Sequence, residues 1–185
     1  IIFTSGTTGE PKGVMSAHYN VIAAVKSITS YLENTEDDII LNALPLSFDY
    51  GLYQVLMAFY FGGTVVLEKS FVYPKKVLEK IEQEDVTGFP IVPTMVAFML
   101  QMRDLEEIDF SSLKYLTNTA AALPLSHVKK LQKLLPHVRI YSMYGLTECK
   151  RVSYLPPEYL LKKPDSVGLP IRNCQAQVLE DAACT

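Results

Sequence analysis

The sequence predicts an α/β protein in which helices cover both faces of a largely parallel β-sheet. Short apolar segments rich in β-branched residues alternate along the chain with amphipathic segments of about ten residues or more, and this alternation is typical of βαβ units. Glycine and proline separate the segments. With 49% hydrophobic and 20% charged residues, the composition is that of a globular domain.

Each element is predicted from its local pattern. Helices are expected at 18–32, 50–61, 74–84, 93–102 and 125–135, and in the first of them apolar residues recur every three or four positions. Ser16 is the expected N-cap of the first helix, and Pro74 suits the first turn of the third. Strands are expected at 1–3, where a buried strand ends, and at 39–44, 64–67, 88–92, 113–117, 138–143 and 175–181. Pro90 is unfavourable inside the strand at 88–92.

Bulk properties exclude several classes of protein. A net charge of −3 without a basic stripe argues against a nucleic-acid partner. The apolar runs are shorter than the ~18 residues of a membrane span, and no signal peptide opens the chain. The three cysteines, an odd number without metal-ligand spacing, favour reduced thiols in a cytoplasmic protein. The first residue is not methionine, and both ends fall within expected strands, so an excised fragment is expected.

A glycine- and threonine-rich loop, TSGTTGEPKG at residues 4–13, is the first chemical motif. Glycines let successive backbone N–H groups face one point and so form an anion-binding concavity. The hydroxyls can donate to phosphate oxygens, and Lys12 adds a positive charge. The spacing is not that of a Walker loop, because Pro11 precedes Lys12 and Gly13 follows it.

The second motif is YGLTE at residues 144–148, directly after an expected strand. Ligands of open α/β sheets bind beyond the carboxyl ends of the strands, so this motif is expected at the same rim as the loop at 4–13. The Tyr144 ring can stack on a base, Thr147 can donate to a phosphate, and Glu148 can hold Mg²⁺, which prefers carboxylate oxygens together with substrate phosphates.

Together, the two motifs resemble those of the adenylate-forming, or AMP-binding, superfamily, and specifically its acyl-CoA synthetase branch. The resemblance implies that residues 1–185 are a partial AMP-binding domain that lacks the start of the large domain and the small C-terminal domain. The ribose-binding aspartate and the catalytic lysine of the superfamily lie outside these residues. The chain by itself is therefore expected to be inactive.

The resemblance also implies roles for individual residues. ATP would be held by the loop, the turn at 118–124 and the second motif, through Thr4, Ser5, Gly6, Thr7, Thr8, Gly9, Lys12, Ala121, Ala122, Tyr144, Gly145 and Thr147. Lys12, Thr147 and Glu148 would be catalytic, and Glu148 would bind Mg²⁺. The acid pocket would include Phe48, Asp49, Asn118 and Ala120. The superfamily usually has glycines around positions 119 and 120, and this chain does not.

Activation of a carboxylic acid by ATP, with pyrophosphate release and transfer to coenzyme A, is the implied function. One alternative is an amino-acid-activating domain that passes its product to a carrier-protein thiol, and another is a non-catalytic nucleotide-binding module. Asp49 bears on this choice, because it falls where amino-acid-activating members hold the substrate ammonium. It could equally cap the helix that begins near Tyr50, which is the interpretation favoured here.

Overall fold

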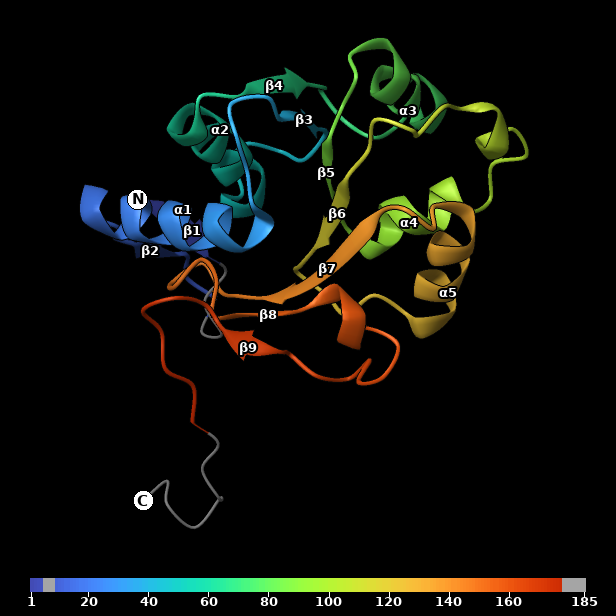
Figure 1. The fold of residues 1–185 in the computed structure, drawn as a ribbon. Helices are drawn as coiled ribbons and strands as arrows, with labels where there is room; N and C mark the ends of the chain where they lie inside the picture. The colour runs from blue at the N-terminus through green and yellow to red at the C-terminus, as the bar shows by residue number, and fades with distance from the viewer. Residues whose placement is uncertain (5–8, 178–185) are drawn as a thin grey trace.

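The computed structural model describes residues 1–4 and 9–177 as a twisted seven-stranded sheet flanked by helices (Figure 1). The strand order is β4-β3-β5-β6-β7-β8-β9. The first five strands in this order run parallel, and β8 and β9 continue the sheet antiparallel. The predicted α/β class with a largely parallel sheet is confirmed.

The elements follow the predicted alternation closely. The strands of the main sheet are β3 (Ile39–Asn42), β4 (Thr64–Leu67), β5 (Gly88–Ile91), β6 (Tyr115–Asn118), β7 (Arg139–Tyr144), β8 (Ser153–Leu155) and β9 (Leu169–Pro170). The α-helices are α1 (His18–Leu32), α2 (Asp49–Phe61), α3 (Pro74–Gln83), α4 (Pro93–Met99) and α5 (Leu125–Leu134). Two 3₁₀ turns are η1 (Leu105–Glu107) and η2 (Pro157–Tyr159).

Helices cover the parallel part of the sheet on two sides. In Figure 1, α1 and α2 lie together on one side, and α3, α4 and α5 lie on the other. This division follows from right-handed crossovers, because the chain moves from β3 to β4 in one direction and then passes back over β3 to reach β5. The strand order therefore reverses between β3 and β5, and ligands of such sheets bind near this kind of reversal.

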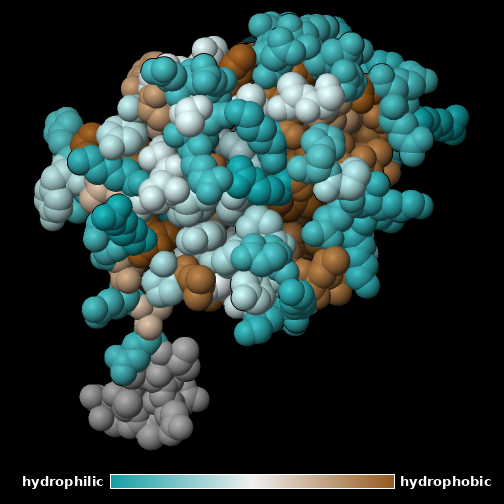
Figure 2. All heavy atoms as spheres, in the orientation of Figure 1, coloured by the Kyte–Doolittle hydropathy of each residue, from teal (hydrophilic) through white to brown (hydrophobic). Residues whose placement is uncertain are grey.

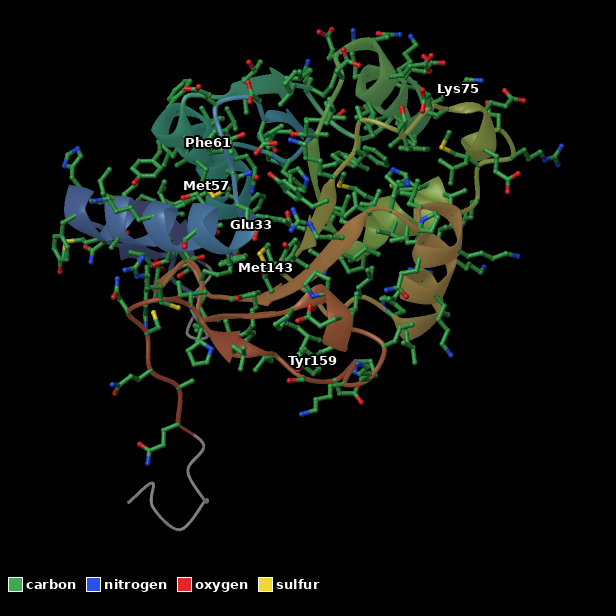
Figure 3. The ribbon with its side chains drawn as sticks, viewed as in Figure 1. Glu33, Met57, Phe61, Lys75, Met143 and Tyr159 are labelled. Atoms are coloured by element: carbon green, nitrogen blue, oxygen red, sulfur yellow. The ribbon has the colours of Figure 1, made fainter. Side chains whose placement is uncertain are left out.

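The core lies between the sheet and the helix layers. Its largest fully buried side chains come mainly from β3, β5 and β6 and from α1, α3, α4 and α5, and they include Ile28, Leu41, Leu78, Phe89, Leu116 and Leu131. Glu33, the C-cap of α1, pairs with Arg139 at 2.8 Å, and the Tyr31 hydroxyl lies 2.9 Å from the sulfur of Met143. Figure 3 labels Glu33 and Met143. These contacts attach α1 to β7.

The first strand differs from its prediction. β1 (Ile2–Thr4) pairs antiparallel with β2 (Lys12–Val14) in a separate two-stranded hairpin, in which Phe3 is 71% exposed. An apolar segment such as 1–3 is typical of a buried strand. The segment itself, however, does not show whether other parts of the chain pack over it. Lys12, expected inside the loop, instead lies in β2, opposite Thr4.

Two further expectations are corrected, and the strand expected at 88–92 is confirmed in spite of Pro90. The N-cap of α1 is Ala17, not Ser16, and its N–H donates to Asn20 Oδ1 at 3.0 Å. Pro90 does lie in a central strand; β5 pairs with β3 through Ile40 and Gly88, so the missing N–H falls beyond that pairing. Residues 175–177 are not a strand, and the rest of the strand expected at 175–181 lies outside the described residues.

The surface in the orientation of Figure 2 is mostly hydrophilic, with hydrophobic residues emerging in its right half around α4 and α5. Exposed apolar side chains in that region include Phe98 on α4 and Leu125 on α5. Of the helices within 1–4 and 9–177, none is both long enough and apolar enough to cross a bilayer.

Candidate active site at the carboxyl ends of the strands

A cavity of about 550 Å³ opens at the carboxyl ends of β6 and β7. Three segments form its wall: the turn after β6 (119–125), the end of β7 with the residues that follow it (142–146), and the loop at 164–167. The cavity therefore brings together Ala120, Ala121, Ala122, Tyr144 and Gly145, which sequence analysis assigned to the nucleotide and acid sites from two separate motifs.

The turn after β6 has a strained backbone. Ala120 has a φ of 71°, in the left-handed region that favours glycine. The superfamily usually has glycines at this turn, and this chain adopts the same left-handed backbone conformation with alanine at position 120. Asn118 supports the turn, since its Nδ2 donates to the carbonyl oxygen of Ala121 at 2.9 Å. Its Oδ1 is buried and accepts no hydrogen bond from the described residues.

The second motif is the loop of a β-hairpin between β7 and β8. Tyr144 is the last residue of β7, and its carbonyl oxygen accepts from the Val152 N–H at 2.9 Å. Gly145 has no room for a side chain, because a Cβ there would lie 2.2 Å from the carbonyl oxygen of Lys150. The tight return holds the Tyr144 ring, 44% exposed, beside the cavity.

Thr147 and Glu148 lie at the tip of the same hairpin. Lys150 Nζ donates to the carbonyl oxygen of Thr147 at 2.5 Å, while Glu148 is exposed and has no ion-pair partner in the described part of the chain. A free, exposed carboxylate suits a hard cation that also binds phosphate oxygens. Among the described residues, no group of three His, Cys, Asp or Glu side chains is placed to hold a metal by itself.

Glu148 lines a second cavity, of about 320 Å³, rather than the cavity at Tyr144. This cavity lies between α1, the hairpin tip and the segment at 171–174, and Met15 and Ser16 complete its wall. Since Met15 directly follows β2, the chain leaving the Gly-rich motif reaches the wall that carries Glu148. Different parts of the β7–β8 hairpin loop therefore line the two cavities, Gly145 and Leu146 the first and residues 148–151 the second.

The Gly-rich motif is described in part. Thr4 and Lys12 face each other across the β1–β2 hairpin, and Gly9 has a φ of 90°, which suits glycine. The predicted phosphate contacts of Ser5, Gly6, Thr7 and Thr8 lie outside the described residues. Lys12 is exposed and has no carboxylate partner among the residues that are described, so its charge is available to a ligand.

Phe48 and Asp49 follow β3, near the point where the strand order reverses. Phe48, 64% exposed, is the N-cap of α2, and Asp49 is the first residue of the helix. No side-chain cap bond forms there, so the interpretation of Asp49 as the N-cap is wrong. Asp49 is half-buried and lines neither cavity described above. Burial raises the pKa of Tyr53 to about 12, and the Asp49 charge contributes to that rise.

Two residues that sequence reasoning missed join these segments. Tyr50, beside Asp49, donates its hydroxyl hydrogen bond to the carbonyl oxygen of Thr117 at 2.7 Å. Arg151, three residues after Glu148, donates from an Nη atom to Thr119 Oγ1 at 3.0 Å. Arg151 had a signal in the sequence, because two adjacent cations, Lys150 and Arg151, follow the second motif after a single cysteine. Tyr50 had none beyond its place next to Asp49.

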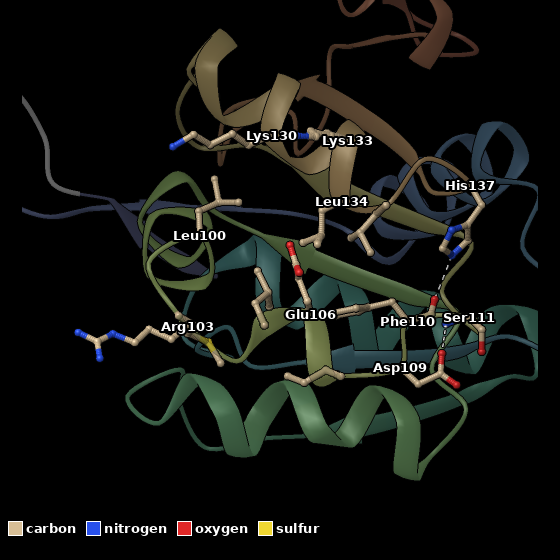
Figure 4. Close-up of a pocket in the computed structure, with 14 residues that line it drawn as sticks. Leu100, Arg103, Glu106, Asp109, Phe110, Ser111, Lys130, Lys133, Leu134 and His137 are labelled. Carbon is tan, nitrogen blue, oxygen red and sulfur yellow. Dashed lines mark hydrogen bonds between the residues drawn. The ribbon is translucent and has the colours of Figure 1, made fainter.

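A larger cavity, of about 770 Å³, lies at the opposite ends of the strands (Figure 4). It is bordered by η1, the segment leading into β6 and the end of α5, and His137 contacts the carbonyl oxygen of Phe110 there at 3.1 Å. His137 precedes β7, so this cavity is at the amino ends of the strands. Although this cavity is the larger one, it is not the candidate active site, because open α/β sheets bind their ligands at the carboxyl ends of the strands.

Comparison with known proteins agrees with the motifs. The sequence pattern of the family described as AMP-binding enzyme matches residues 1–184. Human mitochondrial malonate–CoA ligase ACSF3 is 31% identical over 196 residues, which cover 98% of this chain and 34% of that protein. The 2-succinylbenzoate–CoA ligase of Bacillus pumilus is 35% identical over 180 residues, which cover 96% of this chain and 36% of that protein.

Solved structures show the same fold. VinN superimposes with a TM-score of 0.86 and 32% identity, covering 98% of this chain and 45% of VinN. The o-succinylbenzoate CoA synthetase MenE of Bacillus subtilis, in complex with ATP and magnesium ion, superimposes with a TM-score of 0.86 and 30% identity, covering 97% of this chain and 37% of MenE. The chain spans about a third of the length of the curated relatives it matches.

Proposed function

Because this chain belongs to the AMP-binding enzyme family, we propose that the whole protein activates a carboxylic acid with ATP and transfers the acyl group to coenzyme A. In the first step, a carboxylate oxygen of the acid attacks the α-phosphorus of ATP, and the bond to the β-phosphate breaks. The products are an acyl-adenylate and pyrophosphate. In the second step, the thiolate of coenzyme A attacks the acyl carbonyl carbon and AMP leaves.

The observation that carries this proposal is the cavity at the carboxyl ends of β6 and β7. Two motifs that are distant in the sequence, the turn holding Ala120 and the strand ending at Tyr144, meet in its wall. An exposed aromatic ring opposite a turn of small residues is suited to a flat purine base. This cavity is the proposed adenine site, with Ala121, Ala122 and Gly145 close to the ring.

The phosphates would extend from Tyr144 toward the hairpin tip. Thr147 would contact the α-phosphate, and Lys12, with the hydroxyls of the Gly-rich motif, would hold the β- and γ-phosphates. Glu148 would hold Mg²⁺, which neutralises phosphate charge when bound. Positioning and charge neutralisation supply most of the catalysis in such transfers. The relative MenE has been solved with ATP and magnesium ion, and this supports the choice of ligands.

The acid would lie near Asn118, Ala120 and Phe48, beyond the α-phosphate. The relatives do not agree on one acid, since their names include malonate, 2-succinylbenzoate and long-chain fatty acid. The acid is therefore not assigned by similarity.

An amino-acid-activating enzyme acting with a carrier protein is the second candidate, and one observation favours it. Asp49 is half-buried without capping α2, which leaves its carboxylate available to a substrate ammonium. VinN has also been solved with L-aspartate. A non-catalytic nucleotide-binding module is disfavoured, because the charged residues Lys12 and Glu148 are both present.

The proposal is tested by acid-dependent exchange of radiolabelled pyrophosphate into ATP, using the full-length protein and a panel of fatty, aryl and amino acids. We expect exchange with at least one acid that lacks an amine, followed by thioester formation when coenzyme A is added. Lys12→Met should slow the exchange. Nucleotide binding without exchange for any acid would contradict the proposal, and exchange limited to amino acids would favour the second candidate.

A further inference from the structure

Arg151 is a buried cation that has no acidic partner among the described residues. Arg151 is only 4% exposed, and burying a charged group is costly unless the charge is paired. Within 1–4 and 9–177, the ion pairs are Lys75–Asp104, Lys80–Glu84, Lys114–Asp38 and Arg139–Glu33, and Arg151 is in none of them. An arginine at such a position needs compensation from another source.

The hydrogen bonds of Arg151 supply little of that compensation. A guanidinium carries five N–H donors, and one of the Nη atoms donates to Thr119 Oγ1 at 3.0 Å. The Nε atom is buried and donates to none of the described residues. A donor left unpaired in this way indicates that an acceptor from outside the described chain fits here.

The aromatic neighbours do not carry a negative charge at neutral pH. The guanidinium lies over the Tyr50 ring, 5.3 Å from its centroid. Burial raises the pKa of Tyr50 to about 12, and burial also raises the pKa of Tyr31, against the opposing effect of Arg151. Both phenols therefore remain neutral. The Tyr50 face attracts the cation but cannot neutralise it.

Arg151 lies where the proposed acid site and phosphate site meet. Tyr50 under it adjoins Asp49 on α2, Thr119 beside it belongs to the turn at the adenine cavity, and Arg151 itself follows the hairpin tip that carries Glu148. It also lines the 320 Å³ cavity together with Glu148. An acid whose reacting carboxylate approaches the α-phosphate near Thr147 would therefore be bound close to Arg151.

We propose that Arg151 binds a second anionic group of the acid substrate, so that the substrate class is dicarboxylic acids. A planar guanidinium can hold a carboxylate through two parallel N–H···O bonds, and Nε is one of the atoms that this geometry uses. The proposal rests on the proposed function, because it names the acid that this function would activate. It requires no further reaction step, since the second carboxylate is bound and does not react.

Pyrophosphate exchange by the full-length protein tests this with acids matched in chain length: succinate against butyrate, and glutarate against pentanoate. We expect kcat/KM to favour the dicarboxylate of at least one pair by about 100-fold or more, because a site that pairs a buried charge rejects analogues lacking its partner. Arg151→Met should reduce that preference by about 100-fold. Arg151→Lys, which keeps the charge but loses the fork, should reduce it less. Lys129→Met, which removes an exposed cation on α5, is the matched control.

Several results would overturn the proposal. One is an unmodified protein that activates the monocarboxylates as well as the dicarboxylates, and this comparison decides the matter even if Arg151→Met does not fold. Another is an Arg151→Met protein that loses exchange with both acids of a pair equally, as a structural role predicts. A rise confined to the KM for ATP would instead assign Arg151 to the phosphates. Exchange with monocarboxylates alone would overturn the dicarboxylate proposal but leave the proposed function standing. No exchange with any acid would overturn both.

Discussion

The hydroxyl of Tyr50 lies 2.7 Å from the carbonyl oxygen of Thr117 and 2.9 Å from its Oγ1, which ties the first turn of α2 to the end of β6. Thr117 comes two residues before the turn at 119–125, which lines the proposed adenine site. The same ring lies beneath the guanidinium of Arg151. One buried side chain therefore sets the position of the proposed acid site relative to the proposed nucleotide site.

Replacing Tyr50 by phenylalanine tests this link. Tyr50→Phe should lower the free energy of unfolding by about 1 kcal/mol, because Thr117 Oγ1 loses its partner inside the core. Tyr53→Phe is the control. The Tyr53 hydroxyl is buried without a partner among the described residues, so its removal should change stability by less than about 0.5 kcal/mol or increase it. Urea unfolding of both variants measures the difference, and equal losses would show that the Tyr50 hydrogen bond contributes nothing.

Removing the charge of Glu148 should weaken the first reaction step. Glu148→Gln keeps the shape of the side chain but loses the carboxylate that a hard cation prefers. We expect the pyrophosphate-exchange rate of the full-length protein to fall at least about tenfold and the Mg²⁺ requirement to rise, with the unfolding midpoint unchanged because Glu148 is exposed. Glu106→Gln, at the opposite ends of the strands, is the control. A Mg²⁺ dependence identical to that of the unmodified protein would leave Glu148 a turn residue.

Asp49 acts on Tyr53 and bears on the choice between the two enzyme classes. Asp49→Asn should lower the pKa of Tyr53 from about 12, since burial and then the Asp49 charge raise it. Carbon-13 NMR of labelled tyrosine during an alkaline titration measures the change. In the same variant, we expect exchange with amine-free and amine-bearing acids to change by similar factors. A loss of more than about tenfold confined to amine-bearing acids would support the amino-acid-activating class.

Acid should remove the contribution of Asp38 to stability. Burial opposes ionisation of Asp38, but hydrogen bonds from Lys114, the Thr35 N–H, Asn34 and Thr87 outweigh it and lower its pKa. A carboxylate with a lowered pKa stabilises the fold above the unfolded value of about 3.9, and the contribution falls as the pH drops below it.

The measurement for Asp38 compares the unmodified protein with Asp38→Asn by urea unfolding at several pH values. We expect a difference of about 2 kcal/mol at pH 7 that shrinks below about pH 4 toward the folded pKa. Asp37→Asn, an exposed neighbour, should show almost none. A difference for Asp38 that stays constant down to pH 2 would mean that its ionisation does not stabilise the fold.

The sequence by itself determined the order and type of most elements and the two chemical motifs. Helix 18–32 and strand 64–67 have the predicted bounds, because periodicity, glycine and proline act over a few residues and are visible locally. Only the tertiary structure decided that β1 (Ile2–Thr4) belongs to a separate two-stranded hairpin, that Asp49 does not cap α2, and that Tyr50 and Arg151 join the candidate site. The Tyr50–Thr117 and Arg151–Thr119 contacts connect residues 67 and 32 positions apart. Such contacts depend on how the strands are ordered in the sheet, which no local pattern contains.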